Sequence, residues 1–334
     1  MSDALSAALM LLLATNGPAA LSNRMAAPLG LQAPSAAVAA TATPDPVELE
    51  LQAILTEDEA ALQDIERLVT GADDAATTAL PPLPLTLSAR IRERAAPVRH
   101  RYERFIASHP RHARARLAFG SFLNELGDEE EAIAQWERAR SLEPANPATW
   151  NNLANVYAHI GPVEKSFPYY EEAIRLNPDE PVYLHNFGTL VFMFRRDATN
   201  YFRCDEQTVF RKAFELYQKA IALDPFNFQL AADVAQTYYG WRLPDDGTPG
   251  ERTAAELRLQ DTALRAWTNA LAIAPTDEDR EGVELHFARW HLRGGRFDEA
   301  RASLGRVTND VHSVVRDRLL RSLAERQESA APAP

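Results

Sequence analysis

The sequence predicts an all-α protein, an α-solenoid built from successive pairs of helices. Three prolines that end helices, Pro110, Pro144 and Pro178, stand 34 residues apart along the chain. The segments 115–144 and 149–178, which lead up to the second and third of these prolines, share one frame of apolar, small and aromatic positions. Within that frame the apolar residues recur at helical spacing. A fixed period of this length is typical of repeat proteins whose units stack on one another.

Composition sets limits on the class of protein. The chain has 334 residues, of which 46% are hydrophobic and 25% are charged, and its net charge is −12. Such a chain can bury a substantial core, whereas a nucleic-acid partner is not expected, because neutralising phosphates needs a surplus of Lys and Arg. One basic run, 90–104, belongs to a helix with Val98, Tyr102, Phe105 and Ile106 on one stripe, so its arginines are expected in solvent. The single cysteine, Cys204, excludes an intramolecular disulfide and a metal site built from cysteines.

The N-terminal 46 residues are expected to form an apolar leader followed by an Ala/Pro-rich linker. The apolar run 4–14 has the length of a signal-peptide core and is too short to span a bilayer, although Asp3 stands where a basic residue is expected. Cleavage near 17–23 and a retained Ala-rich leader both remain open. The run favours export, to the periplasm or the medium, over a cytoplasmic location, and no membrane-spanning segment is expected in the mature chain.

The next segments lead into the repeats. Residues 47–70 predict an isolated amphipathic helix with an acidic outer face, and the Pro-rich residues 71–87 predict a second linker. The repeats are expected to fill residues 88–328. This region divides into a half repeat 88–110, full repeats at about 113–144, 147–178, 181–225, 228–275 and 281–308, and a capping helix 310–326. The capping helix carries Val311, Val315, Leu319 and Leu323 on one face.

The repeat frame itself points to a family. In the second full repeat, positions 4, 7, 11 and 24 are bulky, positions 8, 20 and 27 are small and position 32 is proline; in that order they are Trp150, Leu153, Tyr157, Tyr170, Ala154, Ser166, Ala173 and Pro178. This frame resembles the tetratricopeptide repeat, a helix-turn-helix unit that stacks into a right-handed solenoid with a concave groove. Arg116, at position 4 of the first full repeat, is the clear departure.

Two repeats are longer than the period. Pro178 and Pro225 are 47 residues apart and Pro225 and Pro275 are 50 apart, and both excesses fall between the two helices of a repeat, at 195–210 and 241–261. Equivalent insertions in adjacent repeats are expected to be neighbours. The later part of each insertion is expected to lengthen the second helix, with Asp205 and Thr248 as N-caps and Pro249 at the first helical position.

Signals for chemistry are poor. The chain has no glycine-rich phosphate loop, nucleophile elbow or zinc-protease helix, and its histidine pairs lack the spacing of metal ligands. No catalytic residue, metal or cofactor is therefore expected, and the protein is not expected to be an enzyme. The adjacent carboxylates in the insertions, Asp205 with Glu206 and Asp245 with Asp246, fit ordinary helix-start and loop polarity. A polar or cation site between the two insertions is the alternative.

The resemblance implies where a partner would bind. In the family, one face of each first helix lines the groove and holds an extended peptide, with amides that donate to and accept from its backbone. The residues on that face are Ser121, Asn151, Asn152, Asn155, His185, Asn186, Thr189, Asp233 and Gln236. Asparagine is also frequent at three of these places (Asn152, Asn155 and Asn186) in family members whatever they bind. The positions that clamp acidic chaperone tails in some members hold no cation here, so such a tail is not an expected partner.

The sequence as a whole therefore predicts a non-catalytic scaffold for a protein or peptide partner, bound in the concave groove. Two alternatives remain open at this point. One is a repeat subunit that associates with an enzyme. The other is a structural repeat protein whose groove is filled by its own residues 47–69.

Overall fold

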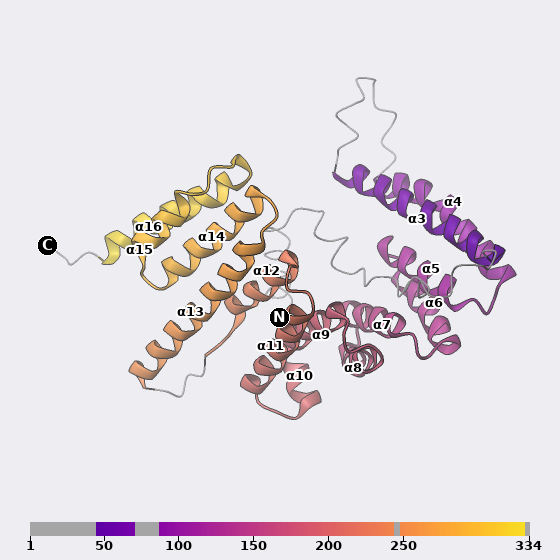
Figure 1. Cartoon of the computed structure of the whole chain (residues 1–334), viewed down its shortest axis with the longest axis horizontal. Helices are drawn as coiled ribbons and strands as arrows, with labels where there is room; N and C mark the ends of the chain where they lie inside the picture. Colours follow the sequence, from indigo (N-terminus) through magenta and orange to yellow (C-terminus); the bar gives the residue numbers. More distant parts are fainter. Residues whose placement is uncertain (1–44, 71–86, 244–247, 331–334) are drawn as a thin grey trace, which may run out of the picture. The chain divides into compact units, whose positions relative to one another are not determined.

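The computed structural model describes residues 45–70, 87–243 and 248–330, and within those ranges the regular structure is entirely helical. The chain divides into two compact units, Met1–Asp179 and Glu180–Pro334, and each is described by itself (Figure 1). The prediction of an all-α fold made of successive helix pairs is confirmed. Residues 1–44 of the predicted leader and linker 1–46, residues 71–86 of the predicted linker 71–87, and Asp245 and Asp246 lie outside the described ranges. In those ranges, we find no helix with the length and hydropathy needed to cross a membrane.

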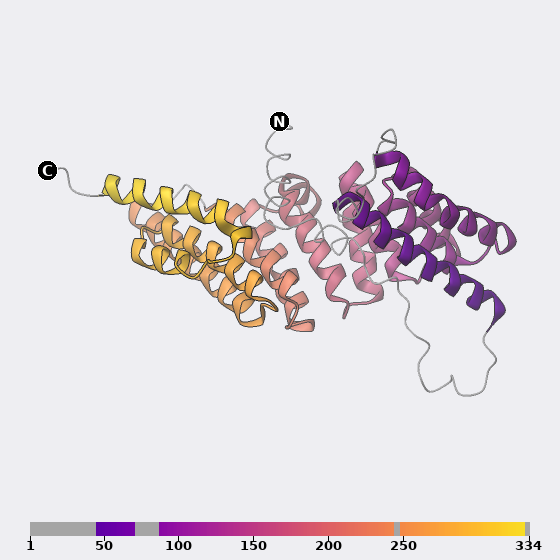
Figure 2. The ribbon, with the colours of Figure 1, turned by 90° about the horizontal axis from the view of Figure 1, so that it is seen from above.

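The first unit contains three helix pairs. These are α3 (Pro46–Thr70) with α4 (Leu87–Ser108), α5 (Ala113–Glu125) with α6 (Glu129–Leu142), and α7 (Pro147–Ile160) with α8 (Ser166–Leu176), which follows the short 3-10 turn η2 (Val163–Lys165). Figures 1 and 2 both show α3 lying along α4. We call the earlier helix of each pair the first helix and the later one the second helix.

The helix at 46–70 does not stand alone, which corrects the expectation for this segment. Leu51, Ile54 and Ala61 of α3 are buried in the same core as Val98, Tyr102 and Phe105 of α4. The Tyr102 hydroxyl also donates a hydrogen bond to Asp58 Oδ2 at 2.6 Å. α3 is therefore the first helix of a leading pair, and the half repeat expected at 88–110 is completed by it. Because that face of α3 packs on α4, the alternative in which residues 47–69 fill the groove is not supported.

Small residues allow close helix contacts at the repeat position that the frame indicates. A Cβ atom on Gly120 would lie 2.5 Å from Trp136 Nε1, so only glycine leaves room for the indole of α6 against α5. The same indole nitrogen donates to the Leu117 carbonyl at 3.1 Å, which fixes the ring across the pair. Gly188 is packed in the same way in the second unit, where its Cβ would lie 2.7 Å from the Tyr217 ring.

The second unit also consists of helix pairs. They are α9 (Pro181–Met193) with α11 (Glu206–Leu223), α12 (Phe228–Thr237) with α13 (Pro249–Ile273), and α14 (Asp277–Arg293) with α15 (Phe297–Leu304). Between the helices of the first two pairs lie α10 (Arg195–Phe202) and the 3-10 turn η3 (Tyr238–Gly240).

The insertions behave as expected at their helix starts. Asp205 caps α11 by accepting from the Thr208 N–H at 2.7 Å. Thr248 caps α13 in a reciprocal capping box with Glu251, and Pro249 is the first helical residue. The two insertions are also neighbours, since Gln207 Nε2 donates to the Arg242 carbonyl at 2.9 Å. These predictions are confirmed.

The C-terminal helix caps the second unit, with one correction. After the 3-10 turn η4 (Asp310–His312), α16 (Ser313–Ala330) packs on α14 and α15 (Figure 2). Leu323 is buried, and Val315 and Leu319 pack against the same core. Val311 was expected on this face but is 68% exposed. Its place in η4, before the α-helix begins, puts it out of register with the other three.

Candidate functional site

The first-helix face of the first unit is less open at α7 than expected. Asn151 has no exposed surface and Asn152 is only 6% exposed. Asn151 Nδ2 donates to Asn152 Oδ1 at 3.4 Å, and Asn152 Nδ2 donates to Ser121 Oγ of α5, also at 3.4 Å. Ser121 in turn donates to the Leu117 carbonyl at 3.2 Å. These amides connect two adjacent first helices, so as open groove residues Asn151 and Asn152 were predicted wrongly.

Asn155 lies one helical turn further along α7 and remains half-buried. Its Oδ1 accepts a hydrogen bond from the Tyr170 hydroxyl of α8, which orients the amide. In the part of the chain that the structure describes, no hydrogen bond uses Asn155 Nδ2, and that nitrogen is not among the buried unpaired atoms. The structure thus leaves one oriented amide donor available on this face.

In the second unit all five predicted residues, namely His185, Asn186, Thr189, Asp233 and Gln236, are half-buried. The Thr189 hydroxyl accepts from Tyr217 at 3.2 Å, and Asp233 lies between Gln229 (Nε2–Oδ1, 2.9 Å) and His185 (Nε2–Oδ2, 3.8 Å). Among the described residues, no hydrogen bond involves the side-chain amide of Gln236. α9 and α12 therefore present a polar first-helix face with one free amide.

The acidic pairs of the insertions do not assemble into a cation site among the described residues. Asp205 is occupied as the N-cap of α11, and the hydrogen bond that its carboxylate accepts from the Thr208 N–H lowers its pKa. Glu206 Oε1 forms an ion pair with Arg195 Nε at 3.2 Å. Across the described ranges, no cluster of three or more His, Cys, Asp or Glu side chains could hold a metal ion. For Asp205 and Glu206, the reading as ordinary helix-start polarity is the one the contacts favour.

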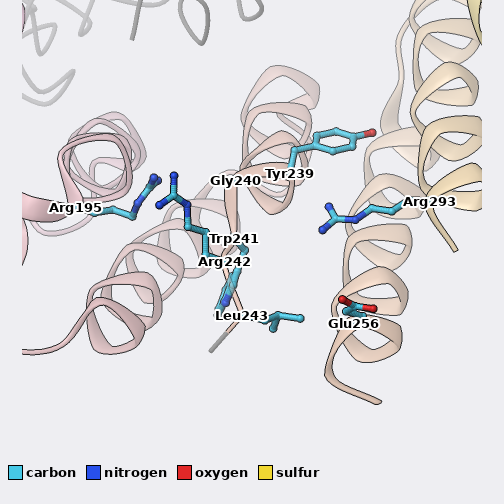
Figure 3. Close-up of a pocket in the computed structure, with 8 residues that line it drawn as sticks. All are labelled: Arg195, Tyr239, Gly240, Trp241, Arg242, Leu243, Glu256 and Arg293. Atoms are coloured by element: carbon cyan, nitrogen blue, oxygen red, sulfur yellow. The ribbon is translucent and has the colours of Figure 1, made fainter. Parts of the chain in front are cut away.

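The insertions instead form an arginine-lined pocket that the sequence reading missed. A cavity of about 460 Å³ lies in the second unit between the start of α10, the segment after α12, and helices α13 and α14. Its lining residues are Arg195, Tyr239, Gly240, Trp241, Arg242, Leu243, Glu256 and Arg293 (Figure 3). The described part of the lining thus contains three arginines and one carboxylate. In Figure 3 Arg195 and Arg242 approach from one side and Arg293 from the other.

Aromatic rings hold this pocket in shape. Trp241 stacks on Phe210 with ring centroids 5.1 Å apart, and the Arg195 guanidinium lies 5.4 Å from the centres of both Phe192 and Phe210. Arg195 also donates to the Phe192 carbonyl at 3.1 Å. Burial lowers the pKa of Arg195, and the nearby charge of Arg242 lowers it further against the raising effect of Glu206.

The opposite wall is fixed in a similar way. The Tyr239 ring stacks on Trp290 at 4.8 Å, and the guanidinium of Arg293 lies 5.1 Å from the centre of the same indole. Burial raises the pKa of Tyr239, so its hydroxyl stays protonated and lies 3.1 Å from His286 Nδ1. The signal in the sequence was the run of aromatic residues before Arg242 together with Arg195 at the start of the other insertion. The adjacent carboxylates of the insertions pointed instead to a cation site.

Comparison with known proteins agrees with the helix-pair architecture. Family models described as "Tetratricopeptide repeat" match residues 99–140 and 147–180, and one described as "TPR repeat" matches residues 120–161. These matches fall in the first unit, on the pairs around α5 to α8.

Solved structures of similar fold include TTC0263, a thermophilic TPR protein in Thermus thermophilus, with 21% identity, a TM-score of 0.42 and coverage of 64% of this chain and 99% of that one. The Pseudomonas aeruginosa protein pilF has 13% identity, a TM-score of 0.46 and coverage of 75% of this chain and 90% of that one.

Curated relatives share part of the chain. A "Photosystem I assembly protein Ycf3" of Prochlorococcus marinus (strain SARG) is 31% identical over 103 residues, which are 30% of this chain and 60% of that protein. The protein of the same name from Synechococcus sp. (strain WH7803) is 30% identical over 126 residues, which are 35% of this chain and 72% of that protein. The chain therefore spans about 60% of the length of the first of these relatives. The chain belongs to the tetratricopeptide repeat family, as shown by the matching family models, these relatives and the helix pairs with small residues at their contacts.

Proposed function

We propose that the protein is a non-catalytic scaffold in which the first-helix face of each unit binds a peptide segment of a protein partner. The observation that carries the proposal is the pair of available side-chain amides at Asn155 and Gln236. Each lies on a first helix, and among the described residues neither Asn155 Nδ2 nor the Gln236 amide has a hydrogen-bond partner.

An amide side chain suits the recognition of peptide backbone. It offers both a donor and an acceptor, which match the N–H and C=O groups that an extended peptide repeats along its length. Asn155 is already oriented by its bond from Tyr170, so binding costs little further side-chain entropy. The neighbouring face residues Ser121 and Thr189 are uncharged, which supports a partner recognised by its backbone.

The relatives support an interaction role. Proteins named for photosystem I assembly are similar to part of this chain, so a role in bringing proteins together is consistent with that likeness. The absence of an enzymatic role remains our inference from the family and from those relatives. The expectation that nucleic acid is not a partner still rests on the net charge of −12. If the partner proves to be an enzyme, the protein is a subunit that associates with it.

Capture of a partner by the full chain tests the proposal. The Asn155→Ala/Gln236→Ala variant is compared with a matched control, Gln63→Ala/Gln218→Ala, which removes exposed amides elsewhere in each unit. We expect about tenfold weaker binding of the captured partner by the first variant, since two hydrogen bonds to the partner are lost, and unchanged binding by the control. Equal binding by both variants would contradict the proposal.

A further inference from the structure

Contacts within the second unit do not engage all three arginines that line its pocket. Of its three arginines, Arg195 is engaged by Glu206 and by two phenylalanine rings, whereas Arg242 and Arg293 are exposed. Among the described residues, neither Arg242 nor Arg293 forms an ion pair. Among the described residues, Glu256 is the one carboxylate in the lining. A chain with a net charge of −12 thus gathers cations around one cavity.

The walls of this cavity are built to hold those cations in place. The backbone of Arg242 is fixed because its carbonyl accepts from Gln207, and its neighbour Trp241 packs on Phe210 and on Phe214 at 4.8 Å. On the other side, Trp290 is 1% exposed and supports both Tyr239 and Arg293. Stacking on an aromatic ring limits the rotamers of a guanidinium while leaving its N–H groups free to donate.

We propose that this pocket binds an oxyanion, a carboxylate or phosphate group carried by a peptide segment of the partner. The inference rests on the proposed function, which supplies the peptide. A guanidinium presents paired N–H donors that match the two oxygens of a carboxylate or phosphate, and charge-assisted hydrogen bonds of this kind are the strong ones. Tyr239 also lines the pocket, with its hydroxyl 3.1 Å from His286 Nδ1. The cavity, about 460 Å³, accommodates such a side chain.

The pocket differs from the first-helix faces in what it selects. Amides at Asn155 and Gln236 suit a neutral backbone, whereas the pocket requires a negative group on the peptide. An anionic residue would therefore determine which peptides are preferred, and the first-helix faces would hold any extended segment.

The test uses the full chain, immobilised, and three pools of acetylated decapeptide amides. Each pool has one fixed central residue, glutamate, phosphoserine or glutamine, and uncharged residues at random elsewhere. We expect capture of the glutamate or phosphoserine pool to exceed that of the glutamine pool about fivefold. This ratio is smaller than a buried bidentate ion pair would give, because Arg242 and Arg293 are exposed. Higher capture of the phosphoserine pool than of the glutamate pool would identify phosphate as the preferred oxyanion. Equal capture of the two pools would show that the pocket accepts either group.

The decisive variant is Arg242→Gln/Arg293→Gln. Arg195 is left intact because its stacking and ion pair contribute to the fold. We expect this variant to lose the preference for anionic pools while its thermal unfolding is unchanged. The control, Arg258→Gln, removes an exposed arginine of α13 outside the pocket and should keep the preference.

Equal capture of all three pools by the natural chain would overturn the inference, and so would an anionic preference that survives the double substitution. The same measurements separate the pocket proposal from the proposed function. If the peptides are captured without regard to charge and the Asn155→Ala/Gln236→Ala variant loses them, the scaffold role stands and only the pocket is refuted.

Discussion

The two units differ in where they place polar residues. In the first unit the pairs α5–α6 and α7–α8 keep the 34-residue period, and the polar residues of adjacent first helices face each other. Asn152 reaches Ser121 at 3.4 Å and is closed off from solvent. In the second unit the pairs that contain α9 and α12 carry extra residues between their helices. Those residues bring Arg195 and Arg242 to the edge of an open cavity.

The difference shows what an insertion adds to a repeat. A regular repeat has few residues that are not engaged by a neighbouring helix, so its polar side chains are drawn into contacts between helices. Extra chain between two helices supplies side chains whose positions the stacking does not determine. In this protein those side chains include Arg195 and Arg242, which aromatic rings support, whereas the neutral amides of Asn155 and Gln236 lie on first helices.

The largest expected effect is that of Phe210→Ala in the second unit. Phe210 is fully buried and supports both Trp241 and Arg195. Removing its ring should lower the free energy of unfolding by about 3–5 kcal/mol and speed hydrogen exchange in α10, α11 and the segment 238–243. Phe226→Ala, at an 83% exposed position of the same unit, is the control and should change little. An equal acceleration of hydrogen exchange in the first unit would contradict the distinction between the units.

The pH dependence of the first unit should come in large part from Asp58. Burial raises the pKa of this carboxyl to about 6, against the lowering effect of the hydrogen bond from Tyr102. The folded state therefore binds the proton more tightly than the unfolded chain, whose ordinary value is 3.8. This contribution is most favourable below pH 3.8, declines as the pH rises to about 6, and amounts to about 3 kcal/mol in total.

Denaturant unfolding at pH 4.5 and pH 7.5, followed by hydrogen exchange in α3 and α4, checks this expectation. Asp58→Asn should remove the decline and stabilise the pair at the higher pH. Tyr102→Phe removes a hydrogen bond that lowers the pKa, so it should move the decline to higher pH. An unchanged pH dependence in Asp58→Asn would show that another group is responsible.

Both units should respond alike to a methyl group at the close helix contacts. Gly120→Ala brings a Cβ within 2.5 Å of the Trp136 indole, and Gly188→Ala brings one within 2.7 Å of the Tyr217 ring. We expect each substitution to cost about 1–3 kcal/mol in thermal or denaturant unfolding. Gly250→Ala is the matched control, because a Cβ there meets no atom within 4 Å. A neutral effect at either contact would mean that the units do not share this packing rule.

The smallest expected effects separate the two asparagines of α7. Asn152→Ala removes two buried hydrogen bonds, one from Asn151 Nδ2 and one to Ser121 Oγ, so we expect a loss of about 1–2 kcal/mol. Asn155→Ala, at a half-buried place, should change stability by less than about 0.5 kcal/mol. The reverse order, measured by denaturant unfolding, would contradict the division into a structural amide and a binding amide.

Much of the fold could be predicted because each helix carries local signals. Asp205 and Thr248 precede helices as N-caps and Pro249 begins one, and these features depend on neighbouring residues alone. The close contact at Gly120 was indicated by the repeat frame. The pairing of α3 with α4 was missed because the segment 71–86 lengthens the spacing beyond the repeat period. Periodicity identifies a helix face but does not tell which neighbour covers it.

The candidate site was less predictable for the same reason. Asn151 and Asn155 lie on one face of α7 at helical spacing, yet one is fully buried and the other is half-buried. Only the position of the adjacent helix decides between them. The pocket joins Arg195 to Arg293 across 98 positions of the sequence, and no local pattern connects residues so far apart.

The central claim is that the first-helix faces contact the partner, and site-specific photo-crosslinking tests it most directly. A photoreactive residue replaces Asn155 or Gln236 in the full chain, and Gln63 or Gln218 in the matched controls. Our account predicts that the captured partner is crosslinked from Asn155 and Gln236 and not from the controls. Crosslinks from Gln63 or Gln218 alone would contradict it.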